Sequence, residues 1–310
     1  MDSRKNIIWS NYVQGPKTLY YSRKLRFDDR FAGQYKALFD PEGKYGQHDT
    51  RTVPVSHKSL KILEVGCGPG ALAGALHRWH PDAEITGIDR DSEFIRFAKE
   101  HEDGITFLEG DATALPFADR SFDVVISNTV SEHIEPSRFY GEQLRVLKED
   151  GICLVLSSRR GITISADCLA MSEKEQKFWD KVQQYDDTMD KYDIGKYPVN
   201  EAEAPAVMER YGFRKIRTGF VTIDLTPDNA GYPAEFAHKI IEADRASELE
   251  RVDSVRRTMP EQFDMEEIEE MKRLVNVKYD TRTAQYDRGE RQWDTCVSVI
   301  MVIRGNRCPE

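Results

Sequence analysis

The strongest constraint in this sequence is a regular alternation of short apolar runs and amphipathic segments between residues 60 and 158. The apolar runs occupy residues 61–66, 84–89, 105–110, 122–128 and 151–158. Helical patterns of roughly ten residues separate them, except that a loop joins the third run to the fourth. This order is typical of βαβ units, in which helices cover both faces of a parallel sheet. We therefore expect an α/β fold.

Beyond residue 158 the alternation is interrupted by charged stretches. We expect helical insertions near residues 160–198 and 230–285, the second with long helices at 234–257 and 261–279. Two further strands are expected at 213–225 and 293–305. The predicted sheet is thus seven-stranded and mostly parallel, with an antiparallel last strand. Residues 1–58 are predicted to form a helical lead-in, or lid, and residues 59–310 the main domain.

Composition disfavours several classes of protein. The chain has 310 residues, 39% hydrophobic and 32% charged, which suits a folded globular protein. Its net charge of −10 disfavours nucleic acid as a partner, because phosphates repel an acidic surface. Its five cysteines include no C-x-x-C pair, which argues against a metal site and a disulfide framework. The sequence shows no membrane-spanning run and no signal-peptide pattern, so we expect a cytoplasmic protein without a membrane partner.

A glycine-rich turn, Leu63-Glu64-Val65-Gly66-Cys67-Gly68-Pro69-Gly70, follows the first apolar run. Glycine permits φ > 0 and lets a ligand approach a backbone that carries no Cβ. Between a strand and a helix, such a turn sets a ligand beside N–H groups of the helix N-terminus. Many nucleotide-like ligands use this arrangement. Glu64 adds negative charge there, which suits a cationic ligand better than a pyrophosphate.

Two aspartates follow the next two strands. Asp89 ends the second strand, at the distance from the glycines where an acid meets ribose hydroxyls in such folds. Asp111 follows the third strand, where it could accept a hydrogen bond from an adenine amine beside the N–H group of Ala112. The alternative for either aspartate is a helix N-cap.

Four motifs in order, LEVGCGPG, GIDRD, GDATALPFADRSFDVV and SNTVSEHI, resemble those of class I S-adenosylmethionine-dependent methyltransferases. The resemblance covers about residues 60–158 and is nearest to the small-molecule branch related to quinone-biosynthesis (type 11) methyltransferases. It implies a Rossmann-like fold with S-adenosylmethionine as cofactor and S-adenosylhomocysteine as product. The cofactor-binding residues that it implies are Glu64, Gly66, Cys67, Gly68, Asp89, Arg90, Asp111, Ala112 and Asn128.

Within that set, the resemblance assigns residues 66–68 to the methionine part of the cofactor and Asp89 to the ribose. It assigns Asp111 and Ala112 to the adenine, and Asn128 to the methionine end of the pocket. Asn128 could instead merely end a strand.

His133 follows the fourth strand, where the reactive end of the pocket is expected. An imidazole has a suitable pKa for a general base, although a histidine there could equally line the pocket without taking a proton. In the lead-in, Tyr12, Tyr20 and Tyr21, with Trp9, could form an aromatic lid over the sulfonium. Their alternative is ordinary packing in a core.

The sequence therefore predicts a methyltransferase that acts on O, N or C of a small-molecule metabolite. The alternative from another class is a non-catalytic module that binds S-adenosylmethionine or a partner. A nicotinamide-dependent oxidoreductase would use a similar glycine turn but leaves Asp111 without a role. A base-modifying enzyme is disfavoured because Asn128-Thr129-Val130-Ser131 lacks the proline–proline–aromatic group. The acceptor and the oligomeric state stay open.

Overall fold

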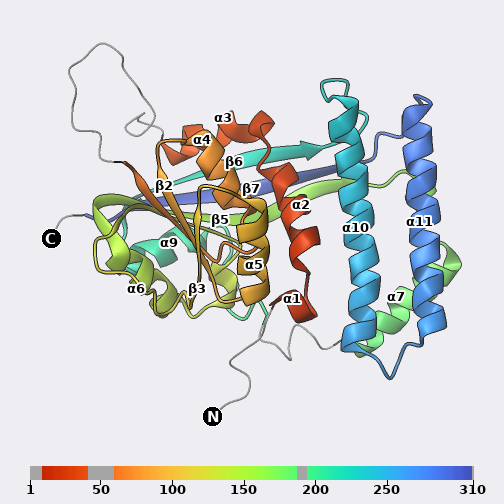
Figure 1. Cartoon of the computed structure of the whole chain (residues 1–310), viewed down its shortest axis with the longest axis horizontal. Helices are drawn as coiled ribbons and strands as arrows, with labels where there is room; N and C mark the ends of the chain where they lie inside the picture. Colours follow the sequence, from red (N-terminus) through yellow and green to blue (C-terminus); the bar gives the residue numbers. More distant parts are fainter. Residues whose placement is uncertain (1–8, 41–58, 187–193, 309–310) are drawn as a thin grey trace. The chain divides into compact units, whose positions relative to one another are not determined.

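The computed structural model describes residues 9–40, 59–186 and 194–308. Within these residues, seven strands form one sheet in the order β3-β2-β1-β4-β5-β7-β6 (Figure 1). The strands are β1 (Lys61–Val65), β2 (Glu84–Asp89), β3 (Thr106–Glu109), β4 (Phe122–Asn128), β5 (Leu147–Ile164), β6 (Arg214–Leu225) and β7 (Thr295–Asn306). Strands β1 to β5 pair in parallel, and the antiparallel strand lies toward the β7–β6 edge. The predicted mostly parallel α/β sheet is confirmed.

The centre of the sheet is buried on both faces. In β1, Ile62, Leu63, Glu64 and Val65 are all buried, as expected for a parallel strand covered by helices. The register pairs Val65 with Ile88 of β2 and with Ser127 of β4. The carboxyl ends of these neighbouring strands are therefore level, so the turns that follow them meet at one edge.

The chain forms two compact units, and one of them comprises residues 26–159, 195–222 and 299–310. Its helices are α3 (Ala32–Phe39), α4 (Ala71–Trp79), α5 (Ser92–His101), α6 (Pro136–Val146) and α9 (Glu203–Arg210), with 3₁₀ turns η2 (Asp29–Phe31) and η3 (Ser131–His133). One face of the sheet packs on α6 and α9, through Phe139, Tyr140 and Met208. Helices α4 and α5 cover the opposite face (Figure 1). We call this the sheet unit.

The other unit comprises residues 1–25, 160–194 and 223–298. Its helices are α1 (Trp9–Tyr12), α2 (Pro16–Arg26, whose last residue falls in the sheet unit), α7 (Glu173–Tyr185), α10 (Ala234–Thr258) and α11 (Met265–Asp287), with the 3₁₀ turn η4 (Asp167–Leu169). Residues of α7, α10 and α11 share one buried apolar cluster that includes Phe178, Val252 and Val275. We call this the helical unit.

The stretch predicted at 160–198 contains the end of β5 and helix α7, and the stretch at 230–285 contains α10 and most of α11. Most of both stretches belongs to the helical unit, as do α1 and nearly all of α2. The boundary between the units falls inside the lead-in, after Leu25. Residues 1–8 and 41–58 of the predicted lead-in lie outside the described residues. Among the helices that the structure describes, none has the length and hydropathy needed to cross a bilayer.

Candidate functional site

Each of the four motifs places residues at the carboxyl end of one of four adjacent strands, β3, β2, β1 and β4. The glycine turn follows β1, Asp89 ends β2, Asp111 follows β3, and Asn128 ends β4. In open α/β sheets, ligands bind at this edge, where the strand order reverses. Here the order reverses between β1 and β4, which places the candidate site at their ends.

The glycine turn is built from left-handed backbone. Gly66, Gly68 and Gly70 have φ values of 70°, 53° and 91°, which residues other than glycine rarely adopt. The N–H groups of Gly66 and Cys67 donate to the carbonyl of Ile88, at 2.8 and 3.0 Å. The turn thus continues the hydrogen bonding between β1 and β2. These two N–H groups are therefore bound inside the protein; the N–H groups expected to meet a ligand are those at the start of α4.

The glycine turn is closely packed against its neighbours. A Cβ on Gly66 would lie 2.5 Å from the Val130 side chain, so Val130 covers the start of the turn. A Cβ on Gly87 would lie 3.0 Å from Cβ of Cys67. Burial raises the pKa of the Cys67 thiol, and the negative charges of Asp89 and Glu64 raise it further. Cys67 is therefore a neutral packing residue, and it can offer only its backbone to a ligand.

Asp89 holds the glycine turn with its carboxylate. Its Oδ2 accepts the N–H group of Gly68 at 2.8 Å, and its Oδ1 accepts that of Asp91 at 2.9 Å. Burial raises the pKa of Asp89, although these two donors act in the opposite direction. A carboxylate has about four acceptor positions, so two more donors, such as ribose hydroxyls, can be accommodated. The N-cap of α5 is Asp91, which leaves Asp89 free of that alternative role.

Asp111 is exposed and shapes its own turn. Its Oδ1 accepts the N–H group and the hydroxyl of Thr113, both at 2.8 Å. Ala112 is half-buried against the apolar cluster of the sheet unit. Asp111 therefore presents an exposed carboxylate after the end of β3, next to Ala112, whose side chain packs against the core. Arg90, which follows Asp89, is also exposed.

The turn after β4 holds a strained residue that the sequence did not reveal. Thr129 has φ = 54°, an unfavourable conformation for a β-branched side chain. Its N–H group donates to the carbonyl of Leu156 at 2.8 Å, which fixes this backbone. The preceding Asn128 has a buried Oδ1 with no hydrogen-bond partner among the described residues. Since buried polar atoms are normally paired, this orphan oxygen suggests a ligand donor.

His133 holds a distant segment of the chain. Its Nδ1 accepts the N–H group of Gly195 at 2.9 Å, and the neighbouring carbonyl of Glu132 accepts that of Tyr197 at 2.9 Å. Arg159 of β5 donates to the carbonyl of Val199 at 3.1 Å. Because Nδ1 is an acceptor, the neutral ring carries its proton on Nε2. This arrangement favours a wall-forming role for His133 over that of a general base.

The three candidate lid tyrosines belong to the helical unit, whereas the residues above belong to the sheet unit. Tyr20 is buried and packs edge-on against Tyr21, with ring centres 5.2 Å apart. Its hydroxyl accepts a hydrogen bond from Lys24 at 2.7 Å. Tyr21 is exposed and Tyr12 half-buried. A lid role for these residues stays a prediction.

Comparison with known proteins agrees with this geometry. Residues 63–155 match the model of a protein family described as a methyltransferase domain. This segment is a methyltransferase domain. The match confirms the resemblance that the four motifs indicate, and it covers the turns at the ends of β1 to β4.

Two curated relatives match longer stretches of the chain. Fatty-acid O-methyltransferase of Mycolicibacterium smegmatis is 40% identical over 173 residues, 50% of this chain and 63% of that protein. Phthiotriol/phenolphthiotriol dimycocerosates methyltransferase 1 of Mycobacterium ulcerans is 40% identical over 117 residues, 36% of this chain and 42% of that protein. The chain thus spans only part of the length of these relatives. Among solved structures, phosphoethanolamine N-methyltransferase 2 of Haemonchus contortus with S-adenosyl-L-methionine is 17% identical, covering 97% of this chain and 59% of that one, with a TM-score of 0.48.

Proposed function

We propose that this protein transfers the methyl group of S-adenosylmethionine to a small-molecule acceptor. One observation carries the proposal. The glycine turn, Asp89, Asp111 and Asn128, which come from the four motifs in turn, lie at the carboxyl ends of adjacent strands, inside the segment matched by the methyltransferase domain. A glycine turn alone would suit many nucleotides, but the acidic residues around it suit a cation.

The residues at this edge fit the cofactor group by group. S-adenosylmethionine, when bound, supplies an electrophilic methyl group on a positively charged sulfur. Asp89 would hold the ribose hydroxyls, and Asp111 with Ala112 would hold the adenine. The orphan Oδ1 of Asn128 would accept a hydrogen bond from the ammonium of the methionine part. Buried Glu64 adds negative charge behind the glycine turn. Residues 66–68 would line the methionine part of the cofactor through backbone atoms other than their N–H groups, which are bound inside the protein.

The contribution of the chain to catalysis would be alignment and exclusion of water. Methyl transfer needs the acceptor atom in line with the methyl group, and positioning alone can contribute several kcal/mol. The segment 195–199 is held by hydrogen bonds to His133, Glu132 and Arg159. It would form a fixed wall near the end of β4. We assign His133 to that wall.

For the acceptor, we propose a fatty acid or another lipid-like carboxylic acid. The support is the name of the relative that acts on fatty acids, together with the role of His133. A carboxylate is already deprotonated at neutral pH, so its methylation requires no general base. We further propose that the protein works in the cytoplasm, with no nucleic acid as substrate. Its five cysteines are all free, which suits a reducing compartment.

The test is methyl transfer from S-adenosylmethionine labelled at the methyl group. We expect labelled methyl esters from a series of fatty acids, and no labelled methyl ethers from fatty alcohols of matched length. Asn128→Ala should weaken binding of S-adenosylhomocysteine, measured by calorimetry. Tight binding of the cofactor without transfer to any lipid acid would favour the non-catalytic module, and no binding at all would refute the whole assignment.

A further inference from the structure

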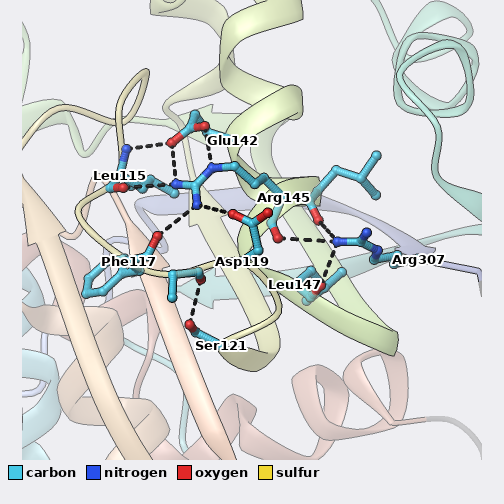
Figure 2. A network of polar contacts seen from close by, with 10 residues as sticks. Leu115, Phe117, Asp119, Ser121, Glu142, Arg145, Leu147 and Arg307 are labelled. Carbon is cyan, nitrogen blue, oxygen red and sulfur yellow. Dashed lines mark hydrogen bonds and ion pairs between the residues drawn. The ribbon is translucent and has the colours of Figure 1, made fainter.

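The loop between β3 and β4 is fastened along the last turn of α6 (Figure 2). Residues 110–121 are all described, and they include neither helix nor strand. Near the end of this loop, Arg120 and Ser121 donate their N–H groups to the carbonyls of Arg145 and Val146, at 3.0 and 2.8 Å. Contacts with α6 therefore determine the path of the loop.

Arg145 makes the central contacts. Its Nε and Nη2 donate to the two oxygens of Glu142, at 2.7 and 2.8 Å. Nη2 also donates to the carbonyl of Leu115 at 2.9 Å. Nη1 donates to the carbonyl of Phe117 and to Asp119 Oδ1, both at 2.8 Å. An arginine has five N–H groups, and here each has an acceptor. Lysine has three donors and no planar fork, so it cannot reproduce this set.

Glu142 completes the arrangement from the same helix. Its Oε2 accepts the N–H group of Leu115 at 2.7 Å. Both backbone groups of Leu115 are thus bound by the Glu142–Arg145 pair, which we call the α6 clamp. The side chain of Leu115 is buried in the core of the sheet unit, and Phe117 packs edge-on against Phe122 with ring centres 4.9 Å apart.

The clamped residue lies directly after the turn that carries the candidate adenine site. Asp111 accepts the N–H group of Ala114 at its carbonyl, 3.0 Å away, and that of Thr113 at its side chain. This compact turn ends where Leu115 begins. A displacement of Leu115 would therefore move the carboxylate of Asp111 and the N–H group of Ala112.

We propose that Arg145, together with Glu142, is a positioning residue that sets the recognition of adenine by Asp111 and Ala112. The proposal rests on the proposed function, because it assumes that the adenosyl group lies at this turn. The clamp would not touch the cofactor. It would act by holding the turn at the distance where a carboxylate can accept from the exocyclic amine.

The test compares S-adenosylhomocysteine with S-inosylhomocysteine, which has an oxygen in place of that amine. We expect the wild-type protein to prefer the adenine compound by about tenfold or more in Kd, the effect of one well-placed hydrogen bond. Arg145→Lys should reduce the preference to about threefold or less. Glu142→Gln provides a second variant, should the first fail to fold.

Arg307→Lys is the matched control. Its Nη1 donates to the carbonyls of Leu144, Arg145 and Leu147, at the same end of α6, and Figure 2 shows it on the side away from the loop. We expect this variant to lower thermal stability while keeping the preference for adenine. A folded Arg145→Lys protein with the wild-type preference would overturn the inference alone. A wild-type protein that binds neither compound would overturn the proposed function and this inference with it.

Discussion

Each unit of the molecule contains an arginine between two carboxylates, and the two clusters differ in their exposure to water. In the helical unit, Arg282 of α11 donates to Asp294 at 2.6 and 2.9 Å and to Asp228 at 3.0 Å, and its side chain is 0% exposed. In the sheet unit, Arg145 binds Glu142 and Asp119, and its side chain is 30% exposed. Both clusters thus pair an arginine with two carboxylates, but only the one around Arg145 is accessible to water.

This difference in exposure indicates that the Arg282 cluster controls stability and the Arg145 cluster controls the position of a loop. Around Arg282 the charges are desolvated, so removing one partner leaves a buried charge without compensation, at a large cost. Asp228 also accepts the N–H groups of Gln292 and Trp293, at 2.7 and 2.9 Å, which ties the chain before β7 to this cluster. Around Arg145, water can replace lost hydrogen bonds, so the position of the loop changes more than the stability does.

The largest expected effect is that of Arg282→Met. Asp228 and Asp294 would remain buried without their cation, so we expect a loss of about 3–5 kcal/mol in the free energy of unfolding. Urea denaturation would measure it, and hydrogen exchange of α11 would show whether the helical unit is the part affected.

The matched variant is Arg145→Met, the same substitution in the more exposed cluster. We expect it to lose only about 1 kcal/mol, because Glu142 and Asp119 stay accessible to water. Equal losses in the two variants would break the comparison. A further variant, Asp228→Asn with Asp294→Asn and Arg282→Met, should recover part of the loss because it removes the unpaired charges.

The second expected effect is a loss of cofactor affinity in the sheet unit. Asp89→Ala removes the acceptor of the Gly68 N–H group and the proposed partner of the ribose. We expect calorimetric affinity for S-adenosylhomocysteine to fall by at least about tenfold, or roughly 1.4 kcal/mol.

Asp123→Ala is the control for this variant. Asp123 accepts from the N–H group of Lys61 and from Lys148 Nζ, at 2.9 and 2.7 Å, and it lies at the opposite end of β4 from Asn128. Its loss should lower stability and leave affinity nearly unchanged. An Asp89→Ala protein with wild-type affinity would remove Asp89 from the site.

The strands were predictable because their apolar runs are buried on both faces. The run at 61–66 corresponds to β1, and the run at 122–128 corresponds to β4. The run at 151–158 predicted only the middle of β5, which extends from Leu147 to Ile164. The extension was missed because Arg159 and Arg160 interrupt the apolar run, and the two isoleucines beyond them, Ile162 and Ile164, are exposed. Pairing with β7 forms it, as the closeness of Gly161 to the Val297 carbonyl indicates.

Helix ends depended on capping residues. We expected a helix from residue 261, and α11 begins at Met265 instead. Asp264 is its N-cap, and a capping box joins Asp264 to Glu267. That signal was present in the sequence. Nothing in the sequence indicated that both insertions group with α2, because contacts between segments far apart in the chain leave no local pattern.

The candidate site was only partly predictable. Spacing from the glycines indicated Asp89, and the position after the third strand indicated Asp111; the sheet brings both to one edge. Thr129 gave no sign of its positive φ, since threonine normally avoids that conformation. Arg145 and Glu142 form an ordinary i,i+3 pair on a helix, and nothing local reveals that they hold a loop thirty residues earlier in the chain.

The smallest expected effect concerns His133, which lies in the sheet unit as Arg145 does but responds to pH. Burial lowers the pKa of His133 below its ordinary 6.5, with Glu132 opposing and Arg90 adding to this change. The neutral ring is thus favoured in the folded protein. Its contribution to stability is complete above pH 6.5 and is lost as the pH falls through the lowered pKa.

Nitrogen NMR of the imidazole would measure both the midpoint and the tautomer. We expect a midpoint below 6.5, with the proton of the neutral ring on Nε2 and Nδ1 as the acceptor from Gly195. His133→Asn identifies the signal. Acidification should release the Gly195 segment, because a protonated Nδ1 cannot accept its N–H group. A proton found on Nδ1 of the neutral ring would instead leave Nε2 unprotonated, and would restore the general-base role that the hydrogen bond to Gly195 argues against.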